Sequence, residues 1–115
     1  MCYRMNADGH RTKTERLEAT LRKLSDEADF EVVVETCYAA AVHRIALACD
    51  RRTRQHHDTH KGLAKYLDDR DLTDLAALFR QLELLRTSRY YGAQSDGKSA
   101  KEARRILAEI QAKLH

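Results

Sequence analysis

FEVVVETCYAAAVHRIALAC, residues 30–49, carries the strongest periodic pattern in the chain. Its β-branched triplet at 32–34 would suit a strand, but the periodic run is longer than an ordinary strand. The small residues at 39–41 favour close packing against other helices. We therefore predict a long helix here, with one broad apolar face. The residues that define this face are Phe30, Val34, Cys37, Ala41, Ile45 and Ala48.

A shorter helix is expected on the N-terminal side of this stretch. Thr14 is a residue type that caps helix N-termini, and Leu17, Leu21 and Leu24 follow it as a narrow stripe. We expect the helix to run from Thr14 to about Glu27. Residues 1–13 show no periodicity and are expected to form a loose tail.

Two more long helices are expected on the C-terminal side. Gly92 suits the C-terminal end of the first, and Ser99 with Glu102 forms a capping box for the second. The first is built on Leu72, Leu75, Leu78, Phe79, Leu82 and Leu85, and the second on Ala103, Ile106, Leu107, Ile110 and Leu114.

The helix at 30–49 is followed by a polar run at 51–60. A short helix carrying Leu63, Tyr66 and Leu67 then leads to the first of the two C-terminal helices. The predicted fold class is therefore all-α, an up-and-down bundle of four main helices plus one short helix. A chain of 115 residues supports one hydrophobic core, so residues 14–115 are expected to form a single domain.

Composition sets limits on the class of protein. With 43% hydrophobic and 34% charged residues, the chain fits a globular domain. The net charge of +3 alone does not indicate a nucleic-acid-binding domain. Arginine outnumbers lysine 14 to 7, which favours phosphate or carboxylate partners, although genome base composition explains this bias equally well.

Cysteine usage and hydropathy indicate the cellular compartment of the protein. Cys2, Cys37 and Cys49 have no Cys-x-x-Cys spacing, so no disulfide framework is expected. No run approaches the roughly 20 apolar residues that span a bilayer, and no signal-peptide core is present. We expect a cytoplasmic protein in a reducing compartment, with no membrane partner.

The segment Arg86-Thr87-Ser88-Arg89-Tyr90-Tyr91-Gly92 is the best candidate for a binding site. Arg86 and Arg89 are three residues apart, so they project from one side of a helix. Guanidinium groups suit phosphates, and the rings of Tyr90 and Tyr91 suit stacked bases. On the next helix, Lys101, Arg104 and Arg105 would extend a basic groove. Alternatively, Leu85 and Tyr90 pack the bundle end and the arginines pair with Asp or Glu.

The histidines are weaker candidates. His56, His57 and His60 lack the glutamate of a His-Glu-x-x-His motif and have no nearby cysteine, so a solvated loop is favoured over a metal site. His43, beside a packed face, is favoured as a structural residue. We predict no metal and no cofactor. The sequence also has no Gly-x-Ser-x-Gly motif and no phosphate-binding glycine loop.

The order of three motifs resembles the HEPN superfamily (higher eukaryotes and prokaryotes nucleotide-binding domain), in particular its small prokaryotic members. These motifs are Tyr38-Ala39-Ala40-Ala41-Val42-His43, His60-Lys61-Gly62-Leu63 and the segment from Arg86 to Gly92. The resemblance covers roughly residues 14–115. It implies an all-helical bundle, commonly a homodimer, whose relatives are RNA-cutting toxins or partners of nucleotidyltransferases.

Active members of that superfamily carry an arginine, four to six residues and then a histidine near the end of a late helix. In this chain Arg86 takes the arginine position, but Tyr91 stands where a histidine is expected. A phenol titrates near ~10 and is a poor general base at neutral pH. The resemblance therefore implies binding of a nucleotide or RNA without the usual ribonuclease activity, so enzymatic activity is uncertain.

Three hypotheses follow. The first is an HEPN-like domain that binds a nucleotide or RNA through Arg86, Arg89, Tyr90 and Tyr91, with His43, His60 and Lys61 as secondary candidates. It would act with a nucleotidyltransferase in a toxin–antitoxin or defence pair. The second is a metal-independent endoribonuclease whose histidine comes from residues 56–60. The third is a pure protein-interaction module.

Overall fold

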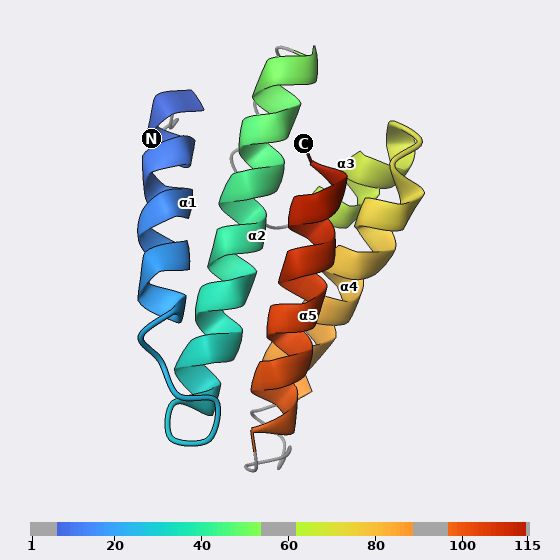
Figure 1. Cartoon of the computed structure of the whole chain (residues 1–115). Helices are drawn as coiled ribbons and strands as arrows, with labels where there is room; N and C mark the ends of the chain where they lie inside the picture. Colours follow the sequence, from blue (N-terminus) through green and yellow to red (C-terminus); the bar gives the residue numbers. More distant parts are fainter. Residues whose placement is uncertain (1–6, 54–61, 89–96, 115) are drawn as a thin grey trace, which may run out of the picture.

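The computed structural model describes residues 7–53, 62–88 and 97–114, with the backbone alone at residues 7, 49–53 and 88. These ranges are helices and their turns, with no strand among them. The helices are α1 (Ala7–Leu21), α2 (Phe30–Thr53), α3 (Leu63–Asp69), α4 (Thr73–Ser88) and α5 (Lys98–Lys113). The four long helices alternate in direction along the chain (Figure 1). The prediction of an all-helical fold with four long helices and one short one is confirmed for the described residues.

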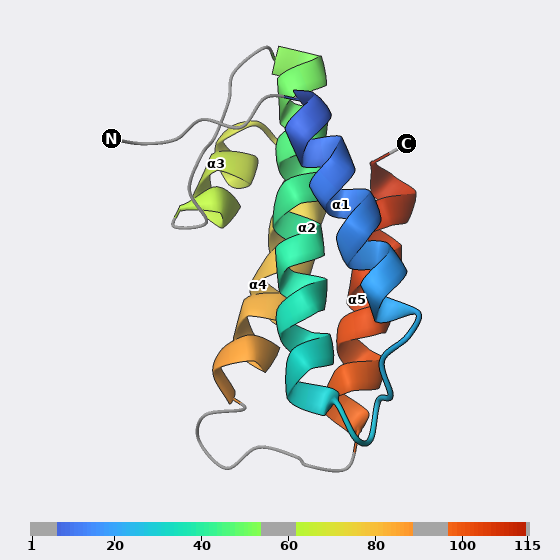
Figure 2. The ribbon, with the colours of Figure 1, turned by 90° about the vertical axis from the view of Figure 1, so that its left-hand side faces the viewer.

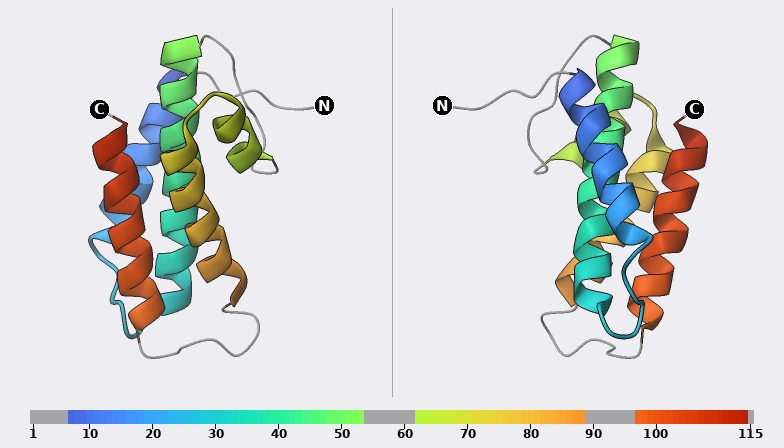
Figure 3. Two further views of the ribbon diagram at one scale, coloured as in Figure 1. Left: turned by 90° about the vertical axis from the view of Figure 1, so that its right-hand side faces the viewer. Right: turned by 60° about the vertical axis from the view of Figure 1, so that its left-hand side comes forward.

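Helix α2 is the centre of the bundle. It packs against α1, α4 and α5, and Figure 2 shows it between α4 and α1. A helix that contacts neighbours on several sides must be apolar around most of its circumference. This explains why its apolar residues are not confined to one stripe, and why the helix prediction is right despite the valine triplet. Helix α3 packs against α4 (Figure 3).

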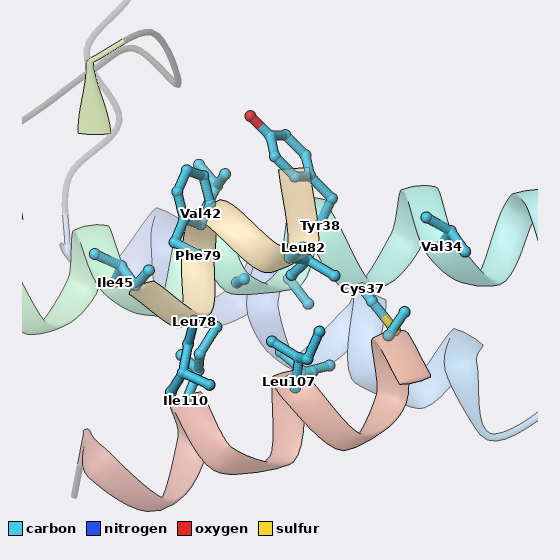
Figure 4. Close-up of a cluster of buried hydrophobic side chains, with 14 of the residues drawn as sticks. Val34, Cys37, Tyr38, Val42, Ile45, Leu78, Phe79, Leu82, Leu107 and Ile110 are labelled. Atoms are coloured by element: carbon cyan, nitrogen blue, oxygen red, sulfur yellow. The ribbon is translucent and has the colours of Figure 1, made fainter. Parts of the chain in front are cut away.

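The core lies where α2, α4 and α5 meet (Figure 4). Helix α2 contributes Val34, Cys37, Tyr38, Val42 and Ile45, helix α4 contributes Leu78, Phe79 and Leu82, and helix α5 contributes Leu107 and Ile110. All of these side chains are buried. The predicted apolar faces are therefore confirmed for their central residues. The residues predicted at their ends are only partly buried: Phe30, Ala48, Leu72, Leu85 and Leu114.

The prediction for the first helix is wrong at both ends. Helix α1 begins at Ala7 and ends at Leu21, so residues 7–13 are not a loose tail and Thr14 is not a cap. His10 and Thr14 are buried, at 5% and 1% exposure. They continue the stripe of Leu17 and Leu21 at helical spacing. An apolar pattern could not reveal this turn of helix, because polar residues occupy its buried positions.

The segment after α1 is a turn rather than the continued helix that we expected. The Ser25 backbone N–H donates to Oδ2 of Asp29 at 2.8 Å, and the Ala28 N–H donates to Oγ of Ser25 at 3.1 Å. Side-chain bonds of this kind compete with helical backbone bonds. They explain why the chain leaves the helix before Glu27.

Two other boundaries differ from expectation. Helix α2 continues to Thr53, so residues 51–53 belong to it and not to the polar connection. Helix α5 begins at Lys98 after Gly97, and no side chain caps it, so Ser99 and Glu102 do not form a capping box. Gly97 has φ +86 and a Cβ there would lie 3.1 Å from the carbonyl oxygen of Asp26. The positive φ and the close approach of Asp26 therefore both favour glycine at this helix start. Gly92, the predicted end of α4, lies outside the described residues.

None of the helices in the described ranges has the length and hydropathy to cross a bilayer.

Candidate functional site

Arg86 lies in the last turn of α4, at the end of the bundle where α2 begins (Figure 1). Its Nε donates a hydrogen bond to Oε1 of Glu35 on α2 at 2.9 Å. Its guanidinium carbon lies 4.6 Å from the centre of the Tyr38 ring, within the range of a cation–π contact. Both charged side chains remain partly exposed, Arg86 at 39% and Glu35 at 34%. We call Arg86, Glu35 and Tyr38 the Arg86 cluster.

Tyr38 connects this cluster to the core. Its ring lies 5.3 Å from that of Phe79 at an interplanar angle of 30°. Figure 4 shows its hydroxyl directed away from the side chains of α5. Burial raises the pKa of the Tyr38 hydroxyl, and the nearby Glu83 raises it further, while Arg86 opposes the shift. The phenol therefore stays neutral at physiological pH and presents a ring face to the arginine.

The cluster fixes where Arg86 is and how it is oriented. A carboxylate holds one edge of the guanidinium while the aromatic ring covers part of its surface, so the charged group occupies a defined position at the end of α4. Such a group can bind a phosphate oxygen without first losing much side-chain entropy. Glu35 and Tyr38 were not among the predicted site residues, because spacing within one helix does not report a contact between two helices.

Arg89, Tyr90 and Tyr91 lie outside the described residues, as do His60 and Lys61. Whether the two tyrosines and the second arginine converge with Arg86 remains a prediction.

His43 lies in a different part of the bundle from Arg86. It is eight residues beyond Glu35 on α2, or about 12 Å along the helix axis. Its Nδ1 is 3.0 Å from Nδ1 of His10 on α1, with ring centres 5.2 Å apart. In this hydrogen bond one Nδ1 is protonated and donates, and the other is unprotonated and accepts. The two rings therefore differ in whether Nδ1 carries a proton. This pairing supports the expected structural role of His43, and His10 was missed because it was assigned to the tail.

The basic residues of α5 do not extend a groove toward Arg86 as proposed from the sequence. Arg104 turns toward the segment between α1 and α2, where its Nε donates to Oδ1 of Asp26 at 2.6 Å. Arg105 pairs with Glu102 and Glu109 on its own helix, and Nζ of Lys101 is 3.5 Å from Glu27. These contacts, and the pairing of Arg86 with Glu35, agree with the alternative that the arginines pair with carboxylates.

Metal and thiol chemistry find no support among the residues that can be placed. Within the described ranges, no three His, Cys, Asp or Glu side chains gather as a metal site would require. Burial raises the pKa of the Cys37 thiol to about 12, so it remains protonated and unreactive. The histidines at 56, 57 and 60 lie outside these ranges.

Comparison with known proteins adds no relative: no family model, no curated protein and no solved structure matches this chain. The functional argument therefore depends on the residues themselves.

Proposed function

We propose that this chain is an HEPN-like helical domain that binds a nucleotide or RNA at the C-terminal end of α4. The observation that carries the proposal is the Arg86 cluster. A partly exposed guanidinium is oriented by Glu35 and Tyr38, immediately before the chain continues into Arg89, Tyr90 and Tyr91. Phosphate would bind the guanidinium groups, and the tyrosine rings would stack on bases.

The proposed activity is binding without cleavage. Cleavage by attack of the ribose 2′-hydroxyl needs a group that transfers protons near neutral pH, and histidine is the usual one. Tyr91 stands at the histidine position of the motif, and His43 contacts His10 instead. In the setting that the resemblance implies, the domain would act as a cytoplasmic homodimer beside a nucleotidyltransferase, in a toxin–antitoxin or defence pair.

The test is a fluorescence anisotropy titration with labelled single-stranded RNA, with ATP as competitor. We expect binding that weakens as salt is raised, because phosphate contacts release counterions. Arg89→Gln should weaken RNA binding by roughly tenfold, the size of a lost charged hydrogen bond. Arg86→Lys should weaken it too, because lysine keeps the charge but loses the planar fork.

Arg80→Gln is the matched control. Arg80 lies on the same helix and pairs with Asp68 at 2.6 Å, so this variant removes the same charge away from the Arg86 cluster. If Arg86→Lys and Arg89→Gln bind RNA as the parent and Arg80→Gln do, the proposed site is wrong. Loss of intact RNA in the presence of a chelator, abolished by Arg86→Ala, would favour the ribonuclease hypothesis. Absence of binding to RNA and ATP would leave the interaction module.

A further inference from the structure

A second feature of the bundle lies away from the Arg86 cluster. A hollow of about 480 Å³, open to solvent, is lined by residues of α1, α2 and α5 and by Arg22 just after α1. Both α1 and α5 pack against α2, and Figure 3 (right) shows the three helices together. We call this hollow the α1–α5 groove. No residue of α4 lines it, so it is separate from the proposed nucleotide or RNA site.

Three arginines from three segments of the chain line the groove: Arg22, Arg44 and Arg104. The carboxylate that shares the lining, Glu18, already accepts hydrogen bonds from Arg44 and from Nε2 of Gln111. Asp26, outside the lining, pairs with Arg104. Three positive charges therefore meet two negative ones, and an anion entering the groove would not face an uncompensated carboxylate.

These arginines keep donors that the fold does not use. Arg44 binds Glu18 through Nε and Nη2, and Arg104 uses Nε and Nη2 for Asp26 and for the carbonyl oxygens of Leu21 and Leu24. Within the described residues, Nη1 of each has no protein acceptor. Arg22 is exposed and makes no ion pair with any residue that the structure describes. Each guanidinium can thus donate to a ligand while the ion pairs that hold the helices stay in place.

The remaining lining is apolar. Leu21 and Leu107, which are 5% and 4% exposed, contribute to the groove from α1 and α5. The volume falls in the range of small-molecule sites, roughly 300–1,000 Å³. The groove therefore combines anion-binding donors with a small apolar floor on which the edge of an organic ligand can rest.

We propose that the α1–α5 groove binds a phosphomonoester of about the size of a nucleoside monophosphate. A phosphomonoester carries close to two negative charges and three acceptor oxygens at neutral pH, which matches several guanidinium groups better than a single carboxylate does. The phosphate contacts Arg22, Arg44 and Arg104, and the organic part lies on Leu21 and Leu107. Arg22 is the best position at which to test ligand affinity. It makes no ion pair with any described residue, so replacing it should leave the fold unchanged.

The test is a calorimetric titration of the full chain with AMP, adenosine and inorganic phosphate. We expect AMP to bind, inorganic phosphate to compete with it and adenosine to bind far more weakly. Arg22→Gln should weaken AMP binding by about five- to tenfold, a charged hydrogen bond discounted for solvent exposure. Lys23→Gln is the matched control, because it removes the same charge one residue along and outside the lining.

Three outcomes would overturn the proposal: equal affinities of Arg22→Gln and Lys23→Gln for AMP, equal affinities of the parent for AMP and adenosine, or failure of phosphate to compete. The two proposed sites are distinguished by their variants. Loss of AMP binding in Arg86→Lys or Arg89→Gln, but not in Arg22→Gln, would assign the nucleotide to the end of α4 and reject the groove. The reverse pattern would support the groove whether or not RNA binds elsewhere.

Discussion

The guanidinium of Arg44 on α2 donates hydrogen bonds to the carboxylate of Glu18 on α1 through two of its nitrogens. Nη2 donates to Oε1 at 2.9 Å and to Oε2 at 2.7 Å, and Nε donates to Oε2 at 3.1 Å. Gln111 on α5 donates to the same Oε2 at 2.7 Å. The Glu18 and Arg44 side chains are only 18% and 28% exposed. One carboxylate thus joins three helices at a partly buried position.

Glu18→Gln should lower the free energy of unfolding by about 1–3 kcal/mol, the range for removing a charged partner from a partly buried hydrogen-bonded pair. In the amide only the oxygen accepts hydrogen bonds and the NH₂ group donates, so one of the two acceptor atoms is lost and Arg44 is left without its counterion. Urea denaturation followed by circular dichroism measures this loss.

A double-mutant cycle isolates the pair. Arg44→Gln alone should also destabilise the fold, and the double variant should lose less than the two single losses added together. Glu102→Gln is the control, because Glu102 pairs with Arg105 on the surface of one helix and should give no resolvable change. Strictly additive losses at Glu18 and Arg44 would contradict the assigned interaction.

The two glycines before α3 and α5 predict different sensitivities to the same substitution. Gly62 and Gly97 both have positive φ, +81 and +86, so Ala at either position should cost about 1–2 kcal/mol of backbone strain. At Gly62 an added Cβ meets no described atom within 4 Å, whereas at Gly97 it lies 3.1 Å from Asp26 O. Gly97→Ala should therefore lose more stability in urea denaturation, and equal losses would mean that the contact with Asp26 relaxes freely.

How much of this fold the sequence predicts depends on where the apolar pattern coincides with burial. Phe79 and Leu82 on α4, and Ile106 and Ile110 on α5, are buried as their period predicts. The start of α1 was missed because His10 fills a buried position by contacting His43 across the bundle. Periodicity reports only the preference of a side chain for water, and it cannot report a polar partner on another helix.

The same limit applies to the candidate site, because spacing within one helix does not report contacts with another helix. The position of Arg86 near the end of α4 is a local property, and the structure agrees with it. Its partners Glu35 and Tyr38 depend on how α2 is rotated against α4, which no spacing within α4 specifies. The arginines of the α1–α5 groove were likewise not identified as a group, because Arg22, Arg44 and Arg104 come together only through packing.

Two leucines on α4 separate core packing from surface exposure. Leu82 is fully buried and Leu84 is 70% exposed. Leu82→Ala should lower the free energy of unfolding by about 2–5 kcal/mol, because it leaves a cavity among packed side chains. Leu84→Ala should change it by less than about 0.5 kcal/mol. Chemical denaturation at several protein concentrations checks both, and a loss for Leu84→Ala that depends on concentration would instead place Leu84 in a contact between copies.

Cys37 provides a probe of native-state opening. Its side chain has no exposed surface, and burial raises the pKa of the thiol from 9.0 to about 12. Only the thiolate attacks a disulfide reagent, so the reactive fraction at about pH 8 falls from roughly a tenth in the unfolded chain to on the order of 10⁻⁴ in the folded one.

The experiment uses a Cys2→Ser, Cys49→Ser background, which leaves Cys37 as the single thiol. Dithiobis(nitrobenzoate) should react with it slowly in buffer and fully in urea. The native rate should rise in Leu82→Ala, because a less stable core opens more often. Immediate stoichiometric labelling of the folded protein would show that the core around Cys37 is open to solvent, which contradicts its burial between α2 and its neighbours.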